Sequence, residues 1–182
     1  MPHRTTAELD AGLASILAAP RIRGTSELLV RRPAEREREL LDAAELSIER
    51  GLIGDRWSIP TEAKPTPHPG KQITIMSSRV IELIAGDDWE LAGDNLFVDL
   101  DLTEDHLPAG SRLGIGDVVL EVTPDPHTGC KKFGERCGID AVAWTKAPAN
   151  AHLRLRGLHA RVITPGTIGR GDMIIVLGSA SS

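Results

Sequence analysis

The chain has 182 residues, of which 41% are hydrophobic and 26% charged, which fits one folded domain without disulfides or a structural metal. Its formal net charge of −5, with no Tyr, two Phe and three Trp, argues against a nucleic-acid-binding protein, which needs a basic field and stacking aromatics. No run approaches the ~20 apolar residues of a membrane span, and the N-terminal segment lacks a signal-peptide pattern. With only two cysteines, Cys130 and Cys137, the chain is predicted to be a cytoplasmic protein in a reducing compartment.

The first third of the chain is predicted to hold two helices and a strand. Residues 6–18 place apolar side chains at helical spacing between a threonine cap and Pro20, which predicts a helical arm on the domain surface. Residues 24–33, GTSELLVRRP, are typical of a short strand that ends at its proline. Residues 34–51, AERERELLDAAELSIERG, carry an apolar stripe at helical spacing before a glycine, so a helix is predicted there. An extended segment around Leu46–Ile48 is the alternative.

From residue 58 onward the pattern is mainly that of β structure. Four prolines make residues 58–70 an irregular loop, and residues 71–76, KQITIM, are the next predicted strand. A helix is expected from Ser77 or Ser78 to Gly86, and a second short helix over Cys130–Cys137. Short β-branched runs lie between Gly-Asp and Pro-Gly turns: NLFVDL, SRLGIGDVVLEVT, LHARVITPG and DMIIVL. This order predicts a mainly β, α+β fold, a closed or partly closed β-barrel with a few peripheral helices.

The segment PDPHTGCKKFG, residues 124–134, surrounds Cys130 with groups that favour a reactive thiol. A thiol reacts as a thiolate, and nearby cations or a helix start lower its pKa. Lys131 and Lys132 follow the cysteine, and His127 precedes it by three residues. The alternative is that Cys130 is a small buried apolar residue, as most free cysteines are.

Other chemistries fit the sequence less well. The C-x6-C spacing of the two cysteines does not match a zinc finger or ribbon, and the four ligands of a structural zinc site are not evident. A Cys–His dyad at Cys130 stays open, whereas Cys137 is expected to pack in the core. The Gly-Asp pairs in GLIGDRW, AGDNL, GIGD and GRGD individually fit turns, although the first two lie where the mouth of a barrel is expected.

The order of five motifs resembles the MOSC domain family, named for the C-terminal part of molybdenum-cofactor sulfurases. The motifs are GLIGDRW, GKQITIMS, LAGDNLFV, GSRLGIGDVVLEVTPDPHTGCKKF and RGLHARVITPGTIGRGD, and the resemblance covers roughly residues 24–178. The chain is also similar to small stand-alone bacterial members and to the core of the mitochondrial amidoxime-reducing component. On this basis we predict a helical arm at 1–23 and a MOSC β-barrel domain at 24–182.

The resemblance implies a molybdenum-pterin cofactor and assigns roles to particular residues. It implies that Cys130 holds a sulfur or ligates molybdenum, and a thiolate is a suitably soft donor. The residues expected to act with it in catalysis are His127, Asn95 and Asp55. The residues expected to bind the cofactor are Arg56, Gln72, Thr128, Lys132, Arg136 and Arg156, with Lys132, Arg136 and Arg156 as candidates for the pterin phosphate. For Arg56 and Arg156, the alternative is an ion pair with Asp55 or another carboxylate.

Three functions are consistent with these assignments. The first is an oxidoreductase that reduces small N-hydroxylated (N-oxygenated) substrates at a Cys-ligated molybdenum-pterin, with electrons from a separate donor protein. The second is a sulfur carrier that holds a persulfide on Cys130, received from a sulfur-donor protein, for transfer to a metal centre. The third is a non-catalytic cofactor-binding module. The chain carries no pyridoxal-phosphate domain, so we do not expect it to abstract sulfur from free cysteine; nor is a nucleic-acid or membrane partner expected.

Overall fold

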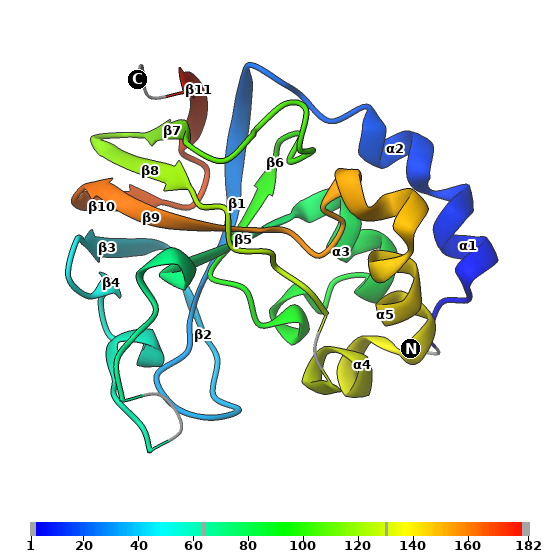
Figure 1. The fold of residues 1–182 in the computed structure, drawn as a ribbon, viewed down its shortest axis with the longest axis horizontal. Helices are drawn as coiled ribbons and strands as arrows, with labels where there is room; N and C mark the ends of the chain where they lie inside the picture. The colour runs from blue at the N-terminus through cyan, green and yellow to red at the C-terminus, as the bar shows by residue number, and fades with distance from the viewer. Residues whose placement is uncertain (1–2, 63–64, 130, 180–182) are drawn as a thin grey trace.

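The computed structural model describes residues 3–62, 65–129 and 131–179, so Cys130 lies outside the described residues. Within them, seven strands close into a barrel in the order β11-β7-β8-β9-β5-β6-β1, and β1 pairs with β11 to complete the ring (Figure 1). The strands are β1 (Arg23–Arg31), β5 (Ile73–Ser77), β6 (Leu96–Asp99), β7 (Ser111–Ile115), β8 (Val118–Val122), β9 (Leu158–Thr164) and β11 (Met173–Ser179). The neighbours pair antiparallel except β5 and β6, which are parallel. The predicted mainly β barrel with peripheral helices is confirmed.

Aliphatic side chains fill the barrel. In β7, Leu113 and Ile115 are buried while Arg112 and Gly114 between them are only partly buried, which is the period of two that one covered sheet face requires. Strand β5 is buried along its whole length, because it lies inside the sheet and also contacts α3. The interior cluster includes Leu29, Ile75, Val98, Leu113 and Leu120.

The predicted helix over residues 34–51 is wrong. The segment forms β2 (Glu39–Leu41), which pairs with β1, and β3 (Ala43–Ser47), which lies between β4 (Gly51–Leu52) and β10 (Gly166–Gly169). Ala44 and Leu46 are buried with exposed Glu45 between them, whereas Leu40 and Ile48, which would complete a helical stripe, are 58% and 51% exposed. Pairing with the distant strand β10 decides the conformation, and the alternative of an extended segment holds for Leu46 within β3.

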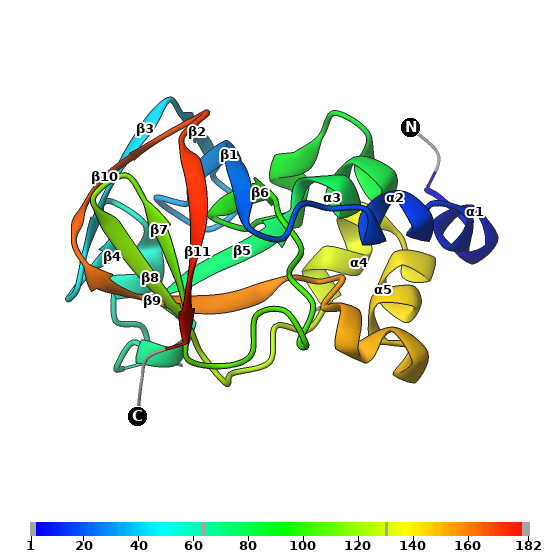
Figure 2. The same cartoon turned by 90° about the horizontal axis from the view of Figure 1, so that it is seen from above.

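The helices gather on one side of the barrel (Figures 1 and 2). They are α1 (Thr6–Ala11), α2 (Leu13–Leu17), α3 (Ser78–Ala85), α4 (Lys131–Cys137) and α5 (Ile139–Lys146), with the 3-10 turns η3 (Trp89–Ala92) and η4 (Pro148–Leu153) among them. The 3-10 turns η1 (Arg56–Ser58) and η2 (Pro69–Lys71) lie on the barrel side (Figure 1), where η2 contacts β9. The apolar faces of the helices enclose a second core that contains Phe97, Phe133 and Trp144. The predicted helices before Gly86 and up to Cys137 are confirmed over α3 and α4, and α5 was not predicted.

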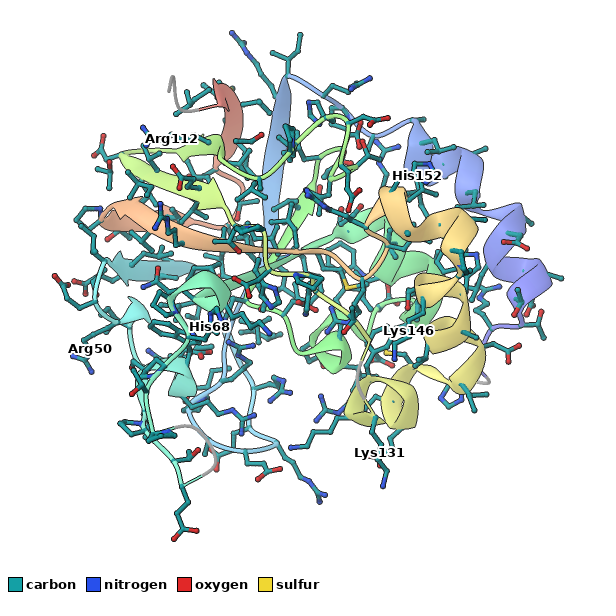
Figure 3. The ribbon with its side chains drawn as sticks, in the orientation of Figure 1. Arg50, His68, Arg112, Lys131, Lys146 and His152 are labelled. Atoms are coloured by element: carbon teal, nitrogen blue, oxygen red, sulfur yellow. The ribbon has the colours of Figure 1, made fainter. Side chains whose placement is uncertain are left out.

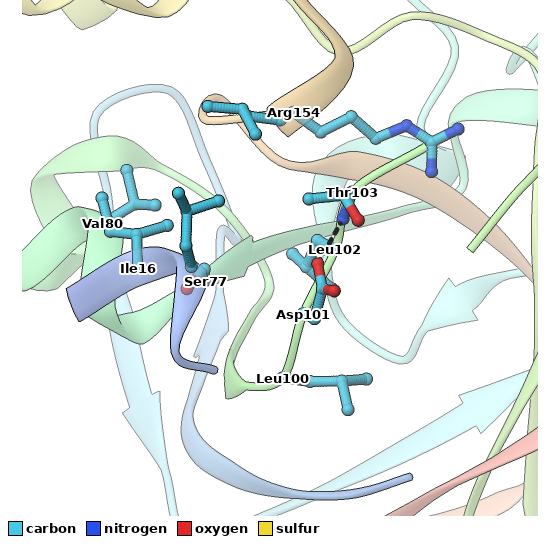
Figure 4. A pocket seen from close by; sticks show the side chains of 10 residues that line it. Ile16, Ser77, Val80, Leu100, Asp101, Leu102, Thr103 and Arg154 are labelled. Atoms are coloured by element: carbon cyan, nitrogen blue, oxygen red, sulfur yellow. Dashed lines mark hydrogen bonds between the residues drawn. The ribbon is translucent and has the colours of Figure 1, made fainter. Parts of the chain in front are cut away.

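The N-terminal arm docks on these helices. A capping box between Thr5 and Glu8 starts α1, as the predicted threonine cap requires. Trp144 Nε1 then donates to Asp10 over 2.8 Å, and Arg79 donates to the carbonyl of Ser15 over 2.9 Å. A cavity of only about 10 Å³, the room of one water, remains between α2 and the segment that follows β6 (Figure 4). The predicted boundary between a helical arm at 1–23 and a β-barrel domain at 24–182 stays a prediction.

Among the described helices, none combines the length and the apolar character needed to cross a bilayer.

Candidate functional site

The candidate site is built around Gly93, Asp94 and Asn95, which connect η3 to strand β6. These residues belong to the motif LAGDNLFV. Gly93 lies beneath two arginines, Asp94 enters a buried ion pair, and Asn95 hydrogen-bonds a buried carboxylate. Three successive residues thus contact three different polar groups: a pair of arginines, a buried ion pair and a buried carboxylate.

The buried carboxylate of Asp55 is bound by Arg32 in a two-point contact. Arg32 Nε donates to Oδ2 over 2.8 Å and Nη2 donates to Oδ1 over 3.0 Å. The backbone N–H groups of Arg32 and Trp57 donate to the same carboxylate. Burial alone would raise the pKa of Asp55, but the hydrogen bond and charge of Arg32 bring it below its usual value. The sequence predicts a catalytic role for Asp55, yet both of its oxygens are engaged within the fold.

Asn95 is also fully engaged. Its Nδ2 group donates to Asp55 over 2.9 Å and to the carbonyl of Val30 over 3.2 Å. Its Oδ1 accepts from Arg32 over 2.9 Å and from the Thr74 hydroxyl over 3.0 Å. The sequence predicts a catalytic role for Asn95, but no amide hydrogen is left to donate to a cofactor or substrate, and the residue orients Asp55 and Arg32 instead.

Two arginines close over Gly93. A Cβ placed on this glycine would come within 3.0 Å of Arg38 Nη2 and 3.4 Å of Arg136 Nη1. Arg136 donates to the carbonyl of Leu91, whereas Arg38 Nε is buried without a hydrogen-bond partner in the described part of the chain. Burial and the charge of Arg136 lower the pKa of Arg38. We call Arg38 and Arg136 the Gly93 arginine pair; across the described residues, neither lies within ion-pair distance of a carboxylate.

On the other side of the connection, Asp94 and Arg156 form an ion pair. Arg156 Nη1 lies 2.5 Å from Asp94 Oδ2, with 7% of the arginine side chain and none of the aspartate side chain exposed. Arg156 also donates to the carbonyl of Ala92 over 3.0 Å and lies 4.5 Å from the centre of the Phe133 ring. Complete burial raises the pKa of Asp94, and the charge of Arg156 opposes that rise. Arg156, expected to bind the pterin phosphate, thus follows the alternative of pairing with a carboxylate.

His127 lies between the carboxylate of Asp94 and the ring of a second histidine, His159. Its Nε2 lies 3.5 Å from Asp94 Oδ1, and its ring centre lies 4.5 Å from that of His159. Burial, followed by the charge of Arg156, places the pKa of His127 well below its ordinary value, so its imidazole is neutral at pH 7. Burial likewise lowers the pKa of His159 to about 4. Asp94 Oδ1 and His127 Nδ1 have no hydrogen-bond partner among the described residues.

A pocket of about 450 Å³ opens beside His127. It is lined by the segment 123–128, which leads from β8 toward α4, by the segment 154–158, which leads into β9, and by Glu104, Thr145, Lys146 and Ala151. A hydrogen bond holds these two segments together: the N–H of Thr123 donates over 2.9 Å to the carbonyl of His159, the residue that follows the second segment. His127, Thr128 and Arg156, all predicted site residues, line this pocket.

The other predicted residues are placed differently. Gln72 donates to the carbonyl of Ile48 and accepts from the N–H of Val162, each over 2.7 Å, so both polar ends of its side chain hold the barrel together. Lys132 pairs with Glu35, and Arg56 is exposed on η1. Lys131 points away from the molecule with 92% of its side chain exposed (Figure 3), 3.9 Å from Glu135. Both lysines next to Cys130 in sequence thus have acidic neighbours.

Cys137 is a buried thiol in the helical core. Only 2% of the residue is exposed, and burial raises its pKa to about 11. It therefore stays protonated and packs against apolar neighbours, as expected from the sequence.

The sequence did not point to Arg32 or Arg38, and Asp94 stood only in a Gly-Asp pair typical of a turn. Arg32 follows β1, and Arg38 precedes β2 in the segment predicted to be helical. Their roles depend on contacts with residues that are distant in sequence, such as the 63-residue separation between Arg32 and Asn95. The available signal was the pair of adjacent arginines at the end of a strand, which by itself is ordinary.

The chain is thus an α+β protein, a closed β-barrel with peripheral helices. Its polar site lies beside the segment that connects β8 to α4. The sequence profile of the MOSC domain matches residues 68–175, more than half of the chain, and the chain therefore belongs to the MOSC domain family. Its fold is similar to that of the YuaD protein from Bacillus subtilis (TM-score 0.64, 21% identity, 86% of this chain and 96% of that chain). It is also similar to YiiM from Escherichia coli (TM-score 0.56, 19% identity, 87% and 72%). A search of curated proteins gives no significant match.

Proposed function

We propose that the chain binds a molybdenum-pterin cofactor and reduces small N-hydroxylated substrates, with Cys130 as the thiolate ligand of the metal. Membership of the MOSC family supports the broader statement of a cofactor-binding or sulfur-related role. The observation that carries the proposal is the Gly93 arginine pair, two cations that meet over one glycine without a carboxylate within ion-pair distance in the described chain. Guanidinium groups suit the phosphate of a pterin cofactor because each offers several N–H donors in one plane.

The donor set fits such a group. Arg38 Nε is buried without a hydrogen-bond partner among the described residues, so an incoming anion would satisfy a group that the fold leaves open. Burial, followed by the charge of Arg136, lowers the pKa of Arg38, and an anion between the two arginines would remove the repulsion between them. A thiolate at Cys130, directly before α4, would add the soft ligand that molybdenum accepts.

In this proposal the residues of the chain bind the phosphate of the cofactor and fix the backbone around it. The Gly93 arginine pair holds the phosphate, and the Arg32–Asp55–Asn95 network fixes the backbone that carries Gly93, since Arg32 donates to its carbonyl over 3.0 Å. When bound, the cofactor supplies a metal centre that accepts the substrate oxygen. Conversion of N–OH to N–H consumes two electrons and two protons and releases water. A separate flavoprotein or iron–sulfur protein is therefore required as the electron donor.

The test is elemental analysis of protein isolated from a host that makes the cofactor. Wild-type protein is expected to contain nearly one molybdenum per chain, Cys130→Ala to lose it, and Cys137→Ala to keep it, because Cys137 is buried in the helical core. Turnover of a benzamidoxime with an artificial electron donor then tests the reduction. Absence of molybdenum from the wild-type protein, or equal behaviour of the two cysteine variants, would contradict the proposal.

The same samples separate the two alternatives. A sulfur carrier would contain cyanide-labile sulfur that disappears in Cys130→Ala, without molybdenum. A non-catalytic cofactor-binding module would contain molybdenum that depends on Cys130 but would not turn over the benzamidoxime.

A further inference from the structure

The pocket beside His127 is large enough for a ligand of its own. Its volume of about 450 Å³ falls within the roughly 300–1,000 Å³ that small-molecule sites occupy. The Gly93 arginine pair does not line it, so the pocket and the proposed phosphate site are formed by different residues. The question is which chemistry the walls of the pocket would recognise.

One part of the wall is apolar and stiff. Leu155 and Leu158 are buried, with 1% and 3% exposed. Pro124 and Pro126, in the segment that leads to α4, also line the pocket, and the ring of each fixes its backbone φ. Such a surface suits a compact apolar or flat body and loses little conformational entropy when it is covered.

Arg154 supplies an incompletely compensated cation. Its side chain is 16% exposed, and Nη1 donates to the carbonyl of Leu107 over 2.6 Å. The carboxylate nearest to it is that of Glu104, 3.9 Å from Nε, and this side chain is 58% exposed. Burial lowers the pKa of Arg154, with the charge of Glu104 acting in the opposite direction, which agrees with a guanidinium that has lost water without gaining a carboxylate in close contact.

The lining also holds two carboxylates, those of Glu104 and Asp125, so the pocket is not positive as a whole and its positive charge is local to Arg154 and Lys146. Lys146, at the end of α5, lines the same pocket (Figure 3), and no carboxylate of the described chain lies within ion-pair distance of it. The carboxylate of Asp125 lies 3.5 Å from His68 Nε2, on the side of η2. Arg156 is neutralised by Asp94, and His127 is uncharged, so neither changes the balance.

We infer that this pocket binds a small organic monoanion, with its carboxylate at Arg154 and Lys146 and its apolar body against the proline and leucine wall. The pocket shares His127, Thr128 and Arg156 with the predicted cofactor site, but the binding proposed here uses neither a thiol nor a cofactor and so goes beyond the proposed redox function. A neutral molecule of the same shape lacks the group that completes the coordination of Arg154. A cation of the same shape would be repelled by Arg154 and Lys146, so it could not place its charged group where the carboxylate is proposed to bind and would have to turn toward Glu104 or Asp125.

The experiment compares benzoate, benzamide and benzylamine, which share a flat apolar body and differ in charge. Dissociation constants are measured on the full chain by amide chemical-shift titration, without molybdenum and also in the Cys130→Ala variant. Benzoate is expected to bind at least tenfold more tightly than the other two, with shifted amides clustered at 123–128 and 151–158. Cys130→Ala should bind it equally well, so failure of the redox proposal leaves this result untouched.

Substitutions of Arg154 and Lys146 test whether these side chains bind the carboxylate of benzoate. Arg154→Gln should weaken benzoate at least tenfold, and Lys146→Gln, an exposed position where folding is not at risk, about threefold. The matched control is Arg50→Gln, an exposed arginine on the barrel side, far from Lys146 in Figure 3, which should bind as wild type. Equal affinity for benzamide, unchanged binding in both pocket variants, or shifts centred on Gly93 would each overturn the inference.

Discussion

Replacing Asp94 with asparagine removes the charge that compensates Arg156 and keeps nearly the same side-chain shape. Because Asp94 is completely buried and only 7% of the Arg156 side chain is exposed, the remaining guanidinium cannot regain water without a movement of the chain. Its hydrogen bond to the carbonyl of Ala92 and its contact with Phe133 hold it where it is. The substitution therefore leaves an unpaired charge in the core.

Removal of one partner of a buried ion pair costs about 3–5 kcal/mol. We expect about 3 kcal/mol for Asp94→Asn, because the amide oxygen of asparagine can still accept a hydrogen bond from Arg156. For a domain of this length, that loss lowers Tm by roughly 6–12 °C. Arg156→Met leaves Asp94 alone and should cost about as much. The double variant leaves no charge at this position, so it should be more stable than the sum of the single losses predicts, by about 2 kcal/mol.

Urea unfolding followed by circular dichroism at pH 7 measures the three variants, with the m-value as a check on two-state behaviour. Glu104→Gln is the control, since its carboxylate is 58% exposed and lies 3.9 Å from Arg154, and it should change the free energy of unfolding by about 0.5 kcal/mol or less. Additive losses in the double variant, or a loss below about 1 kcal/mol for Asp94→Asn, would refute the assignment of a coupled buried pair.

Three further outcomes follow from the site. The pKa of His159 falls from 6.5 to about 4 on folding, so the unfolded state takes up the proton first as pH drops. His159 alone should therefore lower the free energy of unfolding by about 1.4 kcal/mol per pH unit between those values, in addition to the contribution of His127. His159→Gln should remove the His159 part of this pH dependence in urea unfolding. Gly93→Ala and Gly110→Ala both place a side chain at positive φ, +81° and +88°, but only the first crowds the arginine pair. Calorimetry with inorganic phosphate should show at least fivefold weaker binding for Gly93→Ala alone. In Cys130→Ala, a thiol reagent at pH 7 should find no reactive thiol until the protein is unfolded, since Cys137 is buried with a pKa of about 11.

The strands could be predicted from the sequence where the pattern is local. The run from Ile73 to Ser77 and the helix that follows it were evident because apolar period, cap and closing glycine all agree. Residues 34–51 satisfy a helical and an extended pattern together, and only pairing with β10 decides between them. Local pattern carries no information on a partner strand that lies more than a hundred residues further along the chain.

Sequence reasoning selected Asp55, Asn95 and Arg156 but did not reveal their bonding. It assigned Asp55 and Asn95 to catalysis and Arg156 to the cofactor. In the structure each binds another side chain, and the partners Arg32 and Asp94 carried no signal of their own. A buried polar residue needs a partner before it can serve a ligand, and spacing in sequence does not reveal which partner the fold supplies.

The connection at Gly93, Asp94 and Asn95 shows how hydrogen bonds between side chains can support a binding site that they do not form themselves. Successive residues of this chain segment face the arginine pair, the Arg156–His127 side and the Arg32–Asp55 network. The two structural networks hold the backbone on either side of Gly93, so the arginine pair meets a fixed surface rather than a mobile loop. Substitution of Asn95 should then weaken phosphate binding although Asn95 touches neither arginine of the pair, because Arg32 would lose an acceptor and its hold on the carbonyl of Gly93. If Asn95→Ala retained wild-type phosphate affinity in a protein that still folds, the backbone of Gly93 would not need this support.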